Sequence, residues 1–231
     1  MINTRKLLSE TKFYEGYARY DSSLGRYESW NEAVHRVMTM HREKYEPKLK
    51  QLEKYLSFTE DAYKSQLILG AQRALQFGGE QLQKHNIKMF NCVSSYADRP
   101  EFFQECMYML LCGAGAGFSV QHHHIACLPD IEYRSDKHAV VFKPEDSIEG
   151  WADCVGVLMS SYFVQESPFE EYAGKKVHFD LTGIRPKGAE ISGGFKAPGP
   201  EPLRKALDKI ELLLETRLNE GEHRLRSIDV Y

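Results

Sequence analysis

The stretch 90–120 constrains the fold of this 231-residue chain more than any other part. Weak alternation of apolar and polar side chains over Ile87–Val93 predicts a short β-strand with Cys92 near its end. An apolar helix over 99–112 follows, and the run Gly113–Gly117 then leads into a second short strand. Small residues let a polar ligand approach the backbone closely, so a thiol that faces this run is a candidate redox or radical site.

Strand and helix patterns alternate along most of the chain, which is typical of an α/β domain. Ser29 with Glu32 forms a capping-box pattern that predicts a helix start, and Asp98 with Glu101 forms another. Ser147 is expected to cap a third helix. Another helix is expected to begin at Thr59 and to end at Gly78-Gly79, and its inward residues are expected to be Ala62, Leu67, Ala71, Ala74 and Leu75. A strand is expected over 177–181. The last expected element is an amphipathic helix over 201–219, whose apolar stripe consists of Leu203, Leu207, Ile210, Leu214 and Leu218.

The segment before Ser29 contains several tyrosines among charged residues. Gly16 and Gly25 are expected to break any helix there, because glycine is a poor helix former. We therefore expect a surface arm.

Composition places the chain among ordinary globular proteins. Hydrophobic residues make up 42% of it and charged residues 27%, and the net charge of −3 gives no reason to expect nucleic-acid or membrane binding. No apolar run approaches the roughly 20 residues that span a bilayer, and the N-terminus lacks the apolar core of a signal peptide. We expect a cytoplasmic protein with no nucleic-acid or membrane partner.

The cysteine and histidine patterns argue against a disulfide framework and against a metal site. Five cysteines without a CxxC pair do not indicate structural zinc. Four are expected to be packed, reduced thiols, and packing is the alternative interpretation for Cys92 as well. The consecutive residues His122–His124 would point to opposite faces of a strand, so a solvated turn, or one phosphate-binding histidine, is favoured over a metal centre.

The segment Ile184–Pro200 is basic and dense in glycine and proline, so it can hold no regular element for long. Flexible backbone and positive charge suit a loop that grips an anionic ligand. A plain surface connection is the alternative that composition alone leaves open.

Five motifs, in order, resemble the adenosylcobalamin-dependent (class II) ribonucleotide reductases, and among these the monomeric ribonucleoside-triphosphate reductases. They are Arg73–Gly79, Asn91-Cys92, Gly113–Val120, Asp146–Trp151 and Ile184–Ala189, the last followed by Gly193-Gly194 and Ala197–Pro200. The resemblance implies a ten-stranded α/β barrel built from two half-barrels. This chain would hold an N-terminal helical region, 1–85, and the first half-barrel, 86–231, with an insertion at about 121–176 and a specificity loop at about 185–200.

The resemblance also implies an activity, the replacement of the ribonucleotide 2′-hydroxyl by hydrogen through thiyl-radical chemistry. Cys92 would be one of two reducing cysteines, which end as a disulfide that a thioredoxin-like protein reduces. The ribonucleotide substrate would lie against Asn91, Ser94, Gly113, Ala114, Gly115 and Gly117. A deoxynucleoside triphosphate effector would contact the specificity loop at Arg185, Lys187, Gly188, Ser192, Gly193, Gly194 and Lys196. No residue corresponds to a metal ligand.

Part of the family pattern is absent from the chain. The radical cysteine of the family stands in an Asn-x-Cys-x-Glu pattern, which does not occur here, and the C-terminal cysteine pair and the phosphate-binding turn are also missing. We therefore expect a component that is inactive until the C-terminal half of the reductase, which would hold most of the adenosylcobalamin site, joins it.

Two alternatives stay open. One is a non-catalytic, deoxynucleotide-binding regulatory module that derives from a reductase. The other is an oxidoreductase that binds a dinucleotide at Gly113–Gly117, which is the weaker interpretation because the dinucleotide fingerprint follows a strand and opens a helix.

Overall fold

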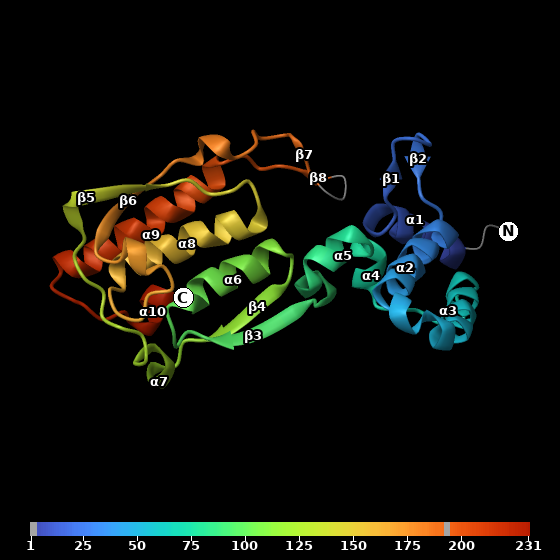
Figure 1. The fold of residues 1–231 in the computed structure, drawn as a ribbon, viewed down its shortest axis with the longest axis horizontal. Helices are drawn as coiled ribbons and strands as arrows, with labels where there is room; N and C mark the ends of the chain where they lie inside the picture. The colour runs from blue at the N-terminus through green and yellow to red at the C-terminus, as the bar shows by residue number, and fades with distance from the viewer. Residues whose placement is uncertain (1–3, 192–194) are drawn as a thin grey trace. The chain divides into compact units, whose positions relative to one another are not determined.

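The computed structural model describes residues 4–191 and 195–231. The chain divides into two compact units (Figure 1). The N-terminal unit consists of Met1–Asn91 with Ile191–Phe195, and the C-terminal unit consists of Cys92–Glu190 with Lys196–Tyr231. Within the described ranges, no helix combines the length and apolar character needed to cross a membrane.

The N-terminal unit is mainly helical. Its elements are α1 (Thr4–Gly16), β1 (Tyr20–Asp21), β2 (Arg26–Tyr27), α2 (Trp30–Lys44), η1 (Glu46–Lys48), α3 (Leu49–Lys64), α4 (Gln72–Phe77), α5 (Glu80–Lys84) and η2 (Asn86–Met89). The predicted capping box of α2 is confirmed: Ser29 Oγ accepts from the Glu32 amide, and the Glu32 carboxylate accepts from the Ser29 amide. The buried face of α2 forms the centre of this unit's core, with Val34, Val37 and Met38 among its members.

Two expectations for this unit are wrong. The segment before Ser29 contains the helix α1, because Gly16 is the last residue of that helix and ends it without preventing it. The next helix begins at Leu49, not at Thr59, and it ends at Lys64 instead of continuing to Gly78-Gly79, which follows the separate helix α4. Leu67 lies between the two helices and is 80% exposed. Pro47 lies in the first turn of η1, where its missing N–H is not needed, so α3 follows the break directly.

A buried carboxylate joins α2 to α3. Glu60 is only 9% exposed and accepts from Arg42 at 2.6 Å and from Lys64 at 2.6 Å, and His35 Nδ1 lies 2.9 Å from its carboxylate. Burial alone would raise the pKa of Glu60, but the hydrogen bonds from Lys64, His35 and Arg42 outweigh it and lower the pKa to about 2.

The C-terminal unit contains two β-α-β crossovers and a long amphipathic helix. Its elements are β3 (Cys92–Tyr96), α6 (Glu101–Leu111), β4 (Gly115–Ser119), α7 (His122–Ile125), β5 (Ser135–Phe142), α8 (Ile148–Tyr162), η3 (Glu170–Tyr172), β6 (Lys175–Phe179), η4 (Leu181–Gly183), α9 (Glu201–Asn219) and α10 (Ser227–Val230). Strand β3 pairs with β4 and β5 pairs with β6, both in parallel. The short strands β7 (Glu190–Ile191) and β8 (Phe195–Lys196) form a further pair.

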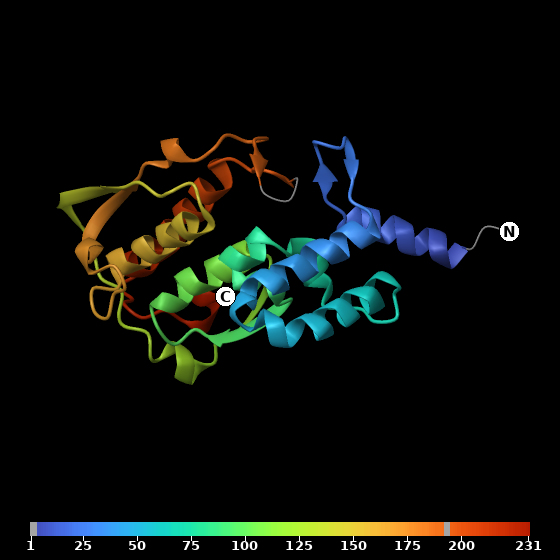
Figure 2. The ribbon, with the colours of Figure 1, turned by 45° about the vertical axis from the view of Figure 1, so that its right-hand side comes forward.

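Helix α8 is the centre of this unit. It is apolar nearly all round and lies between α6 and α9 (Figures 1 and 2). Its predicted cap is confirmed, because Ser147 Oγ accepts from the Gly150 amide at 3.0 Å. A Cβ at Gly150 would lie 2.2 Å from the Glu145 carbonyl oxygen, so the close approach of that chain segment requires glycine.

The leucine stripe predicted for α9 is also confirmed. Leu203, Leu207, Leu214 and Leu218 are buried in the core of the C-terminal unit, and Ile210 packs against it. The mixed helix and strand content agrees with the α/β class, while the expected barrel stays a prediction, because the described strands form pairs only.

The boundaries around β3 differ from the expected ones. Residues 86–89 form the 3-10 helix η2, and the strand begins at Cys92 instead of ending near it. The Asp98 capping box does not form, because Pro100 occupies the cap position of α6 and the Asp98 carboxylate pairs with Arg99 at 2.8 Å.

We predict that Glu60→Gln lowers the free energy of unfolding of the N-terminal unit by about 3 kcal/mol at pH 7. The reason is that folding lowers the pKa of Glu60 from 4.5 to about 2, and the substitution removes this contribution. A carboxyl group with a lowered pKa stabilises the folded state above its ordinary value of 4.5, and this contribution disappears as the pH falls from 4.5 towards 2. The difference between the two proteins should therefore vanish near pH 2. Hydrogen exchange in α2 and α3 during urea unfolding measures it.

The matched control is Glu80→Gln, which removes an exposed partner of Lys84. It should leave the free energy of unfolding nearly unchanged, because exposed ion pairs contribute little. A pH-independent effect of Glu60→Gln would contradict the assignment of this stability to the ionised Glu60 carboxylate.

Candidate functional site

The β3–β4 pair presents one open face. Cys92 lies opposite Gly115, Ser94 opposite Gly117 and Tyr96 opposite Ser119 in the parallel register. Cys92, Ser94 and Tyr96 are exposed, whereas the alternate residues of β3 are half-buried. Because a strand places successive side chains on opposite faces, the exposed set shares one side of the sheet. On that side a thiol and a hydroxyl lie beside glycine backbone, and a phenol lies beside Ser119.

The glycines opposite Cys92 and Ser94 belong to strand β4, not to the loop that the sequence suggested. A Cβ at Gly117 would meet only the Val93 carbonyl oxygen, at an ordinary 3.8 Å. The fold therefore does not require glycine at 117. The missing side chain at this position leaves the face of the sheet uncovered. The run follows helix α6 and enters a strand, so it lacks the strand-to-helix order of a dinucleotide-binding loop.

The other residues predicted to contact substrate have different surroundings. Asn91 belongs to the N-terminal unit, where its side-chain oxygen accepts from Arg73 Nε at 2.5 Å. Gly113, with a φ of 85°, is the left-handed residue that ends α6. Ala114 is buried, so its side chain faces the core. Of the six predicted substrate contacts, the structure brings Ser94, Gly115 and Gly117 together on the Cys92 face.

The environments of the five cysteines separate Cys92 from most of the others. Cys92 and Cys127 are exposed, whereas Cys106, Cys112 and Cys154 are buried. Burial raises the pKa of the Cys106 thiol and raises that of Cys154 to about 12. Cys127 was expected to be packed, and its exposure corrects that expectation. It lies just after α7, and its Sγ donates to the His123 carbonyl.

A histidine adjoins the far end of the open face. His124 Nδ1 lies 2.9 Å from Ser119 Oγ, and the His124 ring lies 4.6 Å from the Tyr96 ring. His122, His123 and His124 form the short helix α7 instead of a strand or turn. Among the described residues, no group of three or more His, Cys, Asp or Glu is placed to hold a metal ion.

The basic loop has an anchored base. Arg185 donates through Nε to Asp146 Oδ2 at 2.6 Å and through Nη2 to the Asp146 carbonyl at 3.2 Å, which ties the loop to the start of α8. Lys196 pairs with Glu190 at 2.9 Å on an exposed surface. Lys187 and Gly188 are exposed. The predicted contacts Ser192, Gly193 and Gly194 lie outside the described residues.

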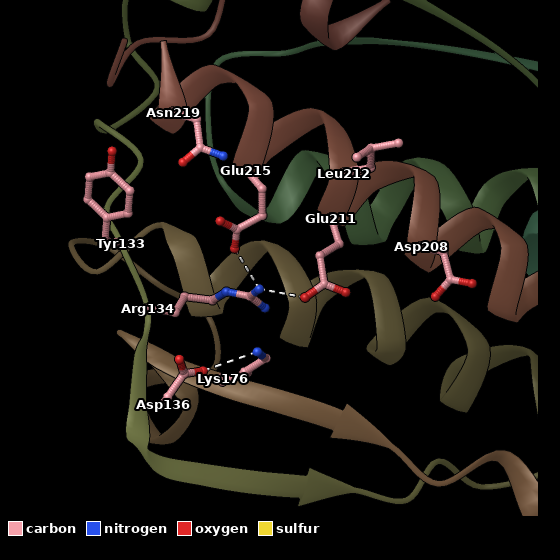
Figure 3. Close-up of a pocket in the computed structure, with 9 residues that line it drawn as sticks. All are labelled: Tyr133, Arg134, Asp136, Lys176, Asp208, Glu211, Leu212, Glu215 and Asn219. Atoms are coloured by element: carbon pink, nitrogen blue, oxygen red, sulfur yellow. Dashed lines mark hydrogen bonds and ion pairs between the residues drawn. The ribbon is translucent and has the colours of Figure 1, made fainter. Parts of the chain in front are cut away.

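Sequence reasoning missed two features of the C-terminal unit. The first is Asp146 as the partner of Arg185, although both belong to motifs that drew attention. The second is a cavity between α9 and the β5–β6 pair, around Arg134 (Figure 3). Arg134 belongs to no motif, and its ion-pair partners are 77 and 81 residues away, so no local signal could have found it.

Comparison with known proteins first shows the class that this chain resembles. The family described as B12-dependent ribonucleotide reductase, insertion domain, matches residues 121–214. A crystal structure of a B-12 dependent (class II) ribonucleotide reductase superposes with a TM-score of 0.74 at 25% identity, covering 96% of this chain and 38% of that one.

Individual relatives agree with that class. The adenosylcobalamin-dependent ribonucleoside-triphosphate reductase of Lactobacillus leichmannii is 28% identical over 92% of this chain and 36% of its own length. A putative reductase of the same description from Mycobacterium phage D29 is 26% identical over 67% of this chain and 26% of its own length. The chain is thus similar to the adenosylcobalamin-dependent (class II) ribonucleotide reductases, and it spans about a third of the length of most of the curated relatives it matches.

We predict that a thiol reagent modifies Cys92 and Cys127 of the native chain much faster than the three buried cysteines, because only an accessible thiolate reacts. Mass spectrometry of peptides after brief alkylation measures the order. After denaturation, all five cysteines should be alkylated at similar rates. Slow modification of Cys92 in the native chain would contradict the open face.

Proposed function

We propose that this chain supplies a reducing cysteine and an effector-responsive loop to a ribonucleotide reductase that converts ribonucleotides to deoxyribonucleotides. The observation that carries the proposal is the exposed Cys92 directly opposite Gly115 on the β3–β4 face, in a chain related to class II reductases over 92% of its length. In this proposal the ribose lies on that face, with Ser94 and the Gly115–Gly117 backbone beside it.

The reaction needs two thiols. Replacement of a 2′-hydroxyl by hydrogen consumes two electrons and two protons: one hydrogen goes to carbon 2′, and one protonates the departing hydroxyl, which leaves as water. Two thiols that join as a disulfide supply both. Cys92 is the first of them, the second comes from another part of a complete reductase, and a thioredoxin-like protein restores both thiols.

Adenosylcobalamin, when bound, would supply the radical that starts this chemistry in a reductase of this class. The cavity of the C-terminal unit is lined mainly by charged side chains, which do not fit a corrin ring. We therefore assign no described residue to the cofactor and derive no step through it. In the proposal, the cofactor site and the radical cysteine belong to the part of a reductase that this sequence does not cover.

The loop 185–200 responds to a deoxynucleoside triphosphate in this proposal. Arg185 holds the loop base against Asp146, and the exposed Lys187 is free to contact the effector. A loop whose base is fixed and whose outer part is basic can change shape with the bound anion. Such a change couples the effector site to base selection, which is what allostery requires.

We predict that Cys92→Ser reduces turnover of the completed enzyme to background, because serine cannot form the disulfide, while nucleotide binding persists. Radiolabelled ribonucleotide reduction and equilibrium binding, measured on the same preparation, test this. Cys127→Ser is the matched control, since it removes the other exposed thiol. Unchanged turnover in Cys92→Ser would contradict the assignment of Cys92 as a reducing cysteine.

The same experiment separates the regulatory alternative from the reductase. Deoxynucleotide binding by the completed assembly, with no turnover that depends on Cys92, would favour a non-catalytic regulatory module.

We predict that Lys187→Ala changes the effector-dependent preference among the four bases by about fivefold or more, because it removes a cation that contacts the effector. Lys205→Ala is the control, an exposed lysine on α9 outside the loop. Competition assays with all four substrates and each effector measure the ratio. A uniform loss for all four bases would point to a folding defect instead.

A further inference from the structure

Three aromatic rings gather where strands β3 and β4 end, and Figure 1 shows α7 beside that end of the pair. Tyr96 is the last residue of β3, and His123 and His124 belong to α7. The centre of the His124 ring lies 4.6 Å from that of Tyr96 and 4.0 Å from that of His123. Tyr96 is 54% exposed and His123 is also exposed, so these three residues, the ring platform, are open to a ligand.

Both strands hold the ring platform in place. His124 Nδ1 lies 2.9 Å from Ser119 Oγ, and Ser119 is the last residue of β4. Ser119 lies opposite Tyr96 in the parallel register, so the His124 ring contacts one strand by packing and the other by a hydrogen bond. Because these rings are already positioned, a ligand that packs on them has less side-chain freedom to immobilise.

The ring platform continues the open face of the β3–β4 pair. Tyr96 is exposed on the same side of β3 as Cys92 and Ser94, and four residues of strand place it about 13 Å from Cys92. In α/β proteins, ligands bind outside the carboxyl ends of parallel strands, which is the Tyr96 end of this pair. A ribose over Cys92 and Ser94 carries its base on carbon 1′, next to carbon 2′. A base that extends along β3 towards its carboxyl end therefore meets Tyr96.

The charges beside the ring platform favour a base over a phosphate chain. Arg99 is the first cationic residue after β3, and it is already paired with Asp98 at 2.8 Å and with Glu105. That guanidinium is therefore not left to neutralise a phosphate. Tyrosine and histidine rings, in contrast, are the side chains on which unpaired nucleobases stack.

We propose that the ring platform binds the base of the nucleotide on the open face, by stacking against Tyr96 with His124 supporting the phenol ring. The inference rests on the proposed function, which supplies the nucleotide. Since every base has a π-face, stacking on Tyr96 favours all four bases. The platform thus adds affinity for bases in general and leaves the choice among them to the effector-responsive loop.

The test is a titration of the ¹⁵N-labelled full chain followed by NMR. Adenosine and cytidine should both shift the amide signals of 94–96 and 122–124, with half-saturation at or below about 10 mM. Ribose, which has no base, should bind at least about fivefold more weakly. Inorganic tripolyphosphate should not shift these signals. No shifts with either nucleoside, or equal shifts with tripolyphosphate, would overturn the proposal.

Tyr96→Leu should weaken adenosine binding at least about fivefold, whereas Tyr96→Phe should bind as the wild type does, because stacking needs the ring and not the hydroxyl. Tyr27→Leu is the matched control. It removes a tyrosine that is 50% exposed and whose ring lies 5.3 Å from that of Tyr20, in a second exposed pair. Undiminished binding to Tyr96→Leu, or an equal loss in Tyr27→Leu, would overturn the proposal.

The binding measurement involves no turnover, so it can be separated from the Cys92→Ser experiment. Adenosine binding without turnover that depends on Cys92 would support the ring platform and contradict the reducing role of Cys92. Turnover that depends on Cys92 without adenosine binding would do the reverse.

Discussion

Parallel strands cannot be joined by a tight turn, so the pairing of β3 with β4 depends on the crossover that α6 makes between them. This pairing decides which side chains share the open face. A shift of one residue in the register would turn Cys92 to the opposite face of the pair and bring Val93 to the open face. The exposure of the Cys92 thiol beside glycine backbone therefore depends both on the apolar helix α6 and on the glycines of β4.

The same principle operates at the second crossover, where α8 joins β5 to β6. Its start is fixed from two sides, by the Ser147 cap and by Arg185, which holds Asp146. Arg185 therefore has a structural role whatever the loop binds. This anchoring gives the loop a fixed base at the start of the most buried helix of the unit.

The sequence predicted those features whose causes are local. The Ser29 and Ser147 caps formed because each hydroxyl needs only an amide three residues away. The leucine stripe of α9 followed from helical periodicity alone. The failures have non-local causes: β3 spans 92–96 because β4 pairs with it there, and the Arg134 site is assembled from segments about 80 residues apart. Asp98 failed as a cap because the neighbouring Arg99 competes for its carboxylate.

Helix α9 connects two regions of opposite charge in the C-terminal unit. Its N-terminus follows the basic loop, where the positive end of the helix dipole adds to the field of the lysines. Its second half carries Glu211 and Glu215, and carboxylates there oppose the negative end of the dipole. Arg134 offsets part of that cost through both glutamates. One helix thus follows a basic loop where it begins and carries clustered carboxylates, held by Arg134, along its second half.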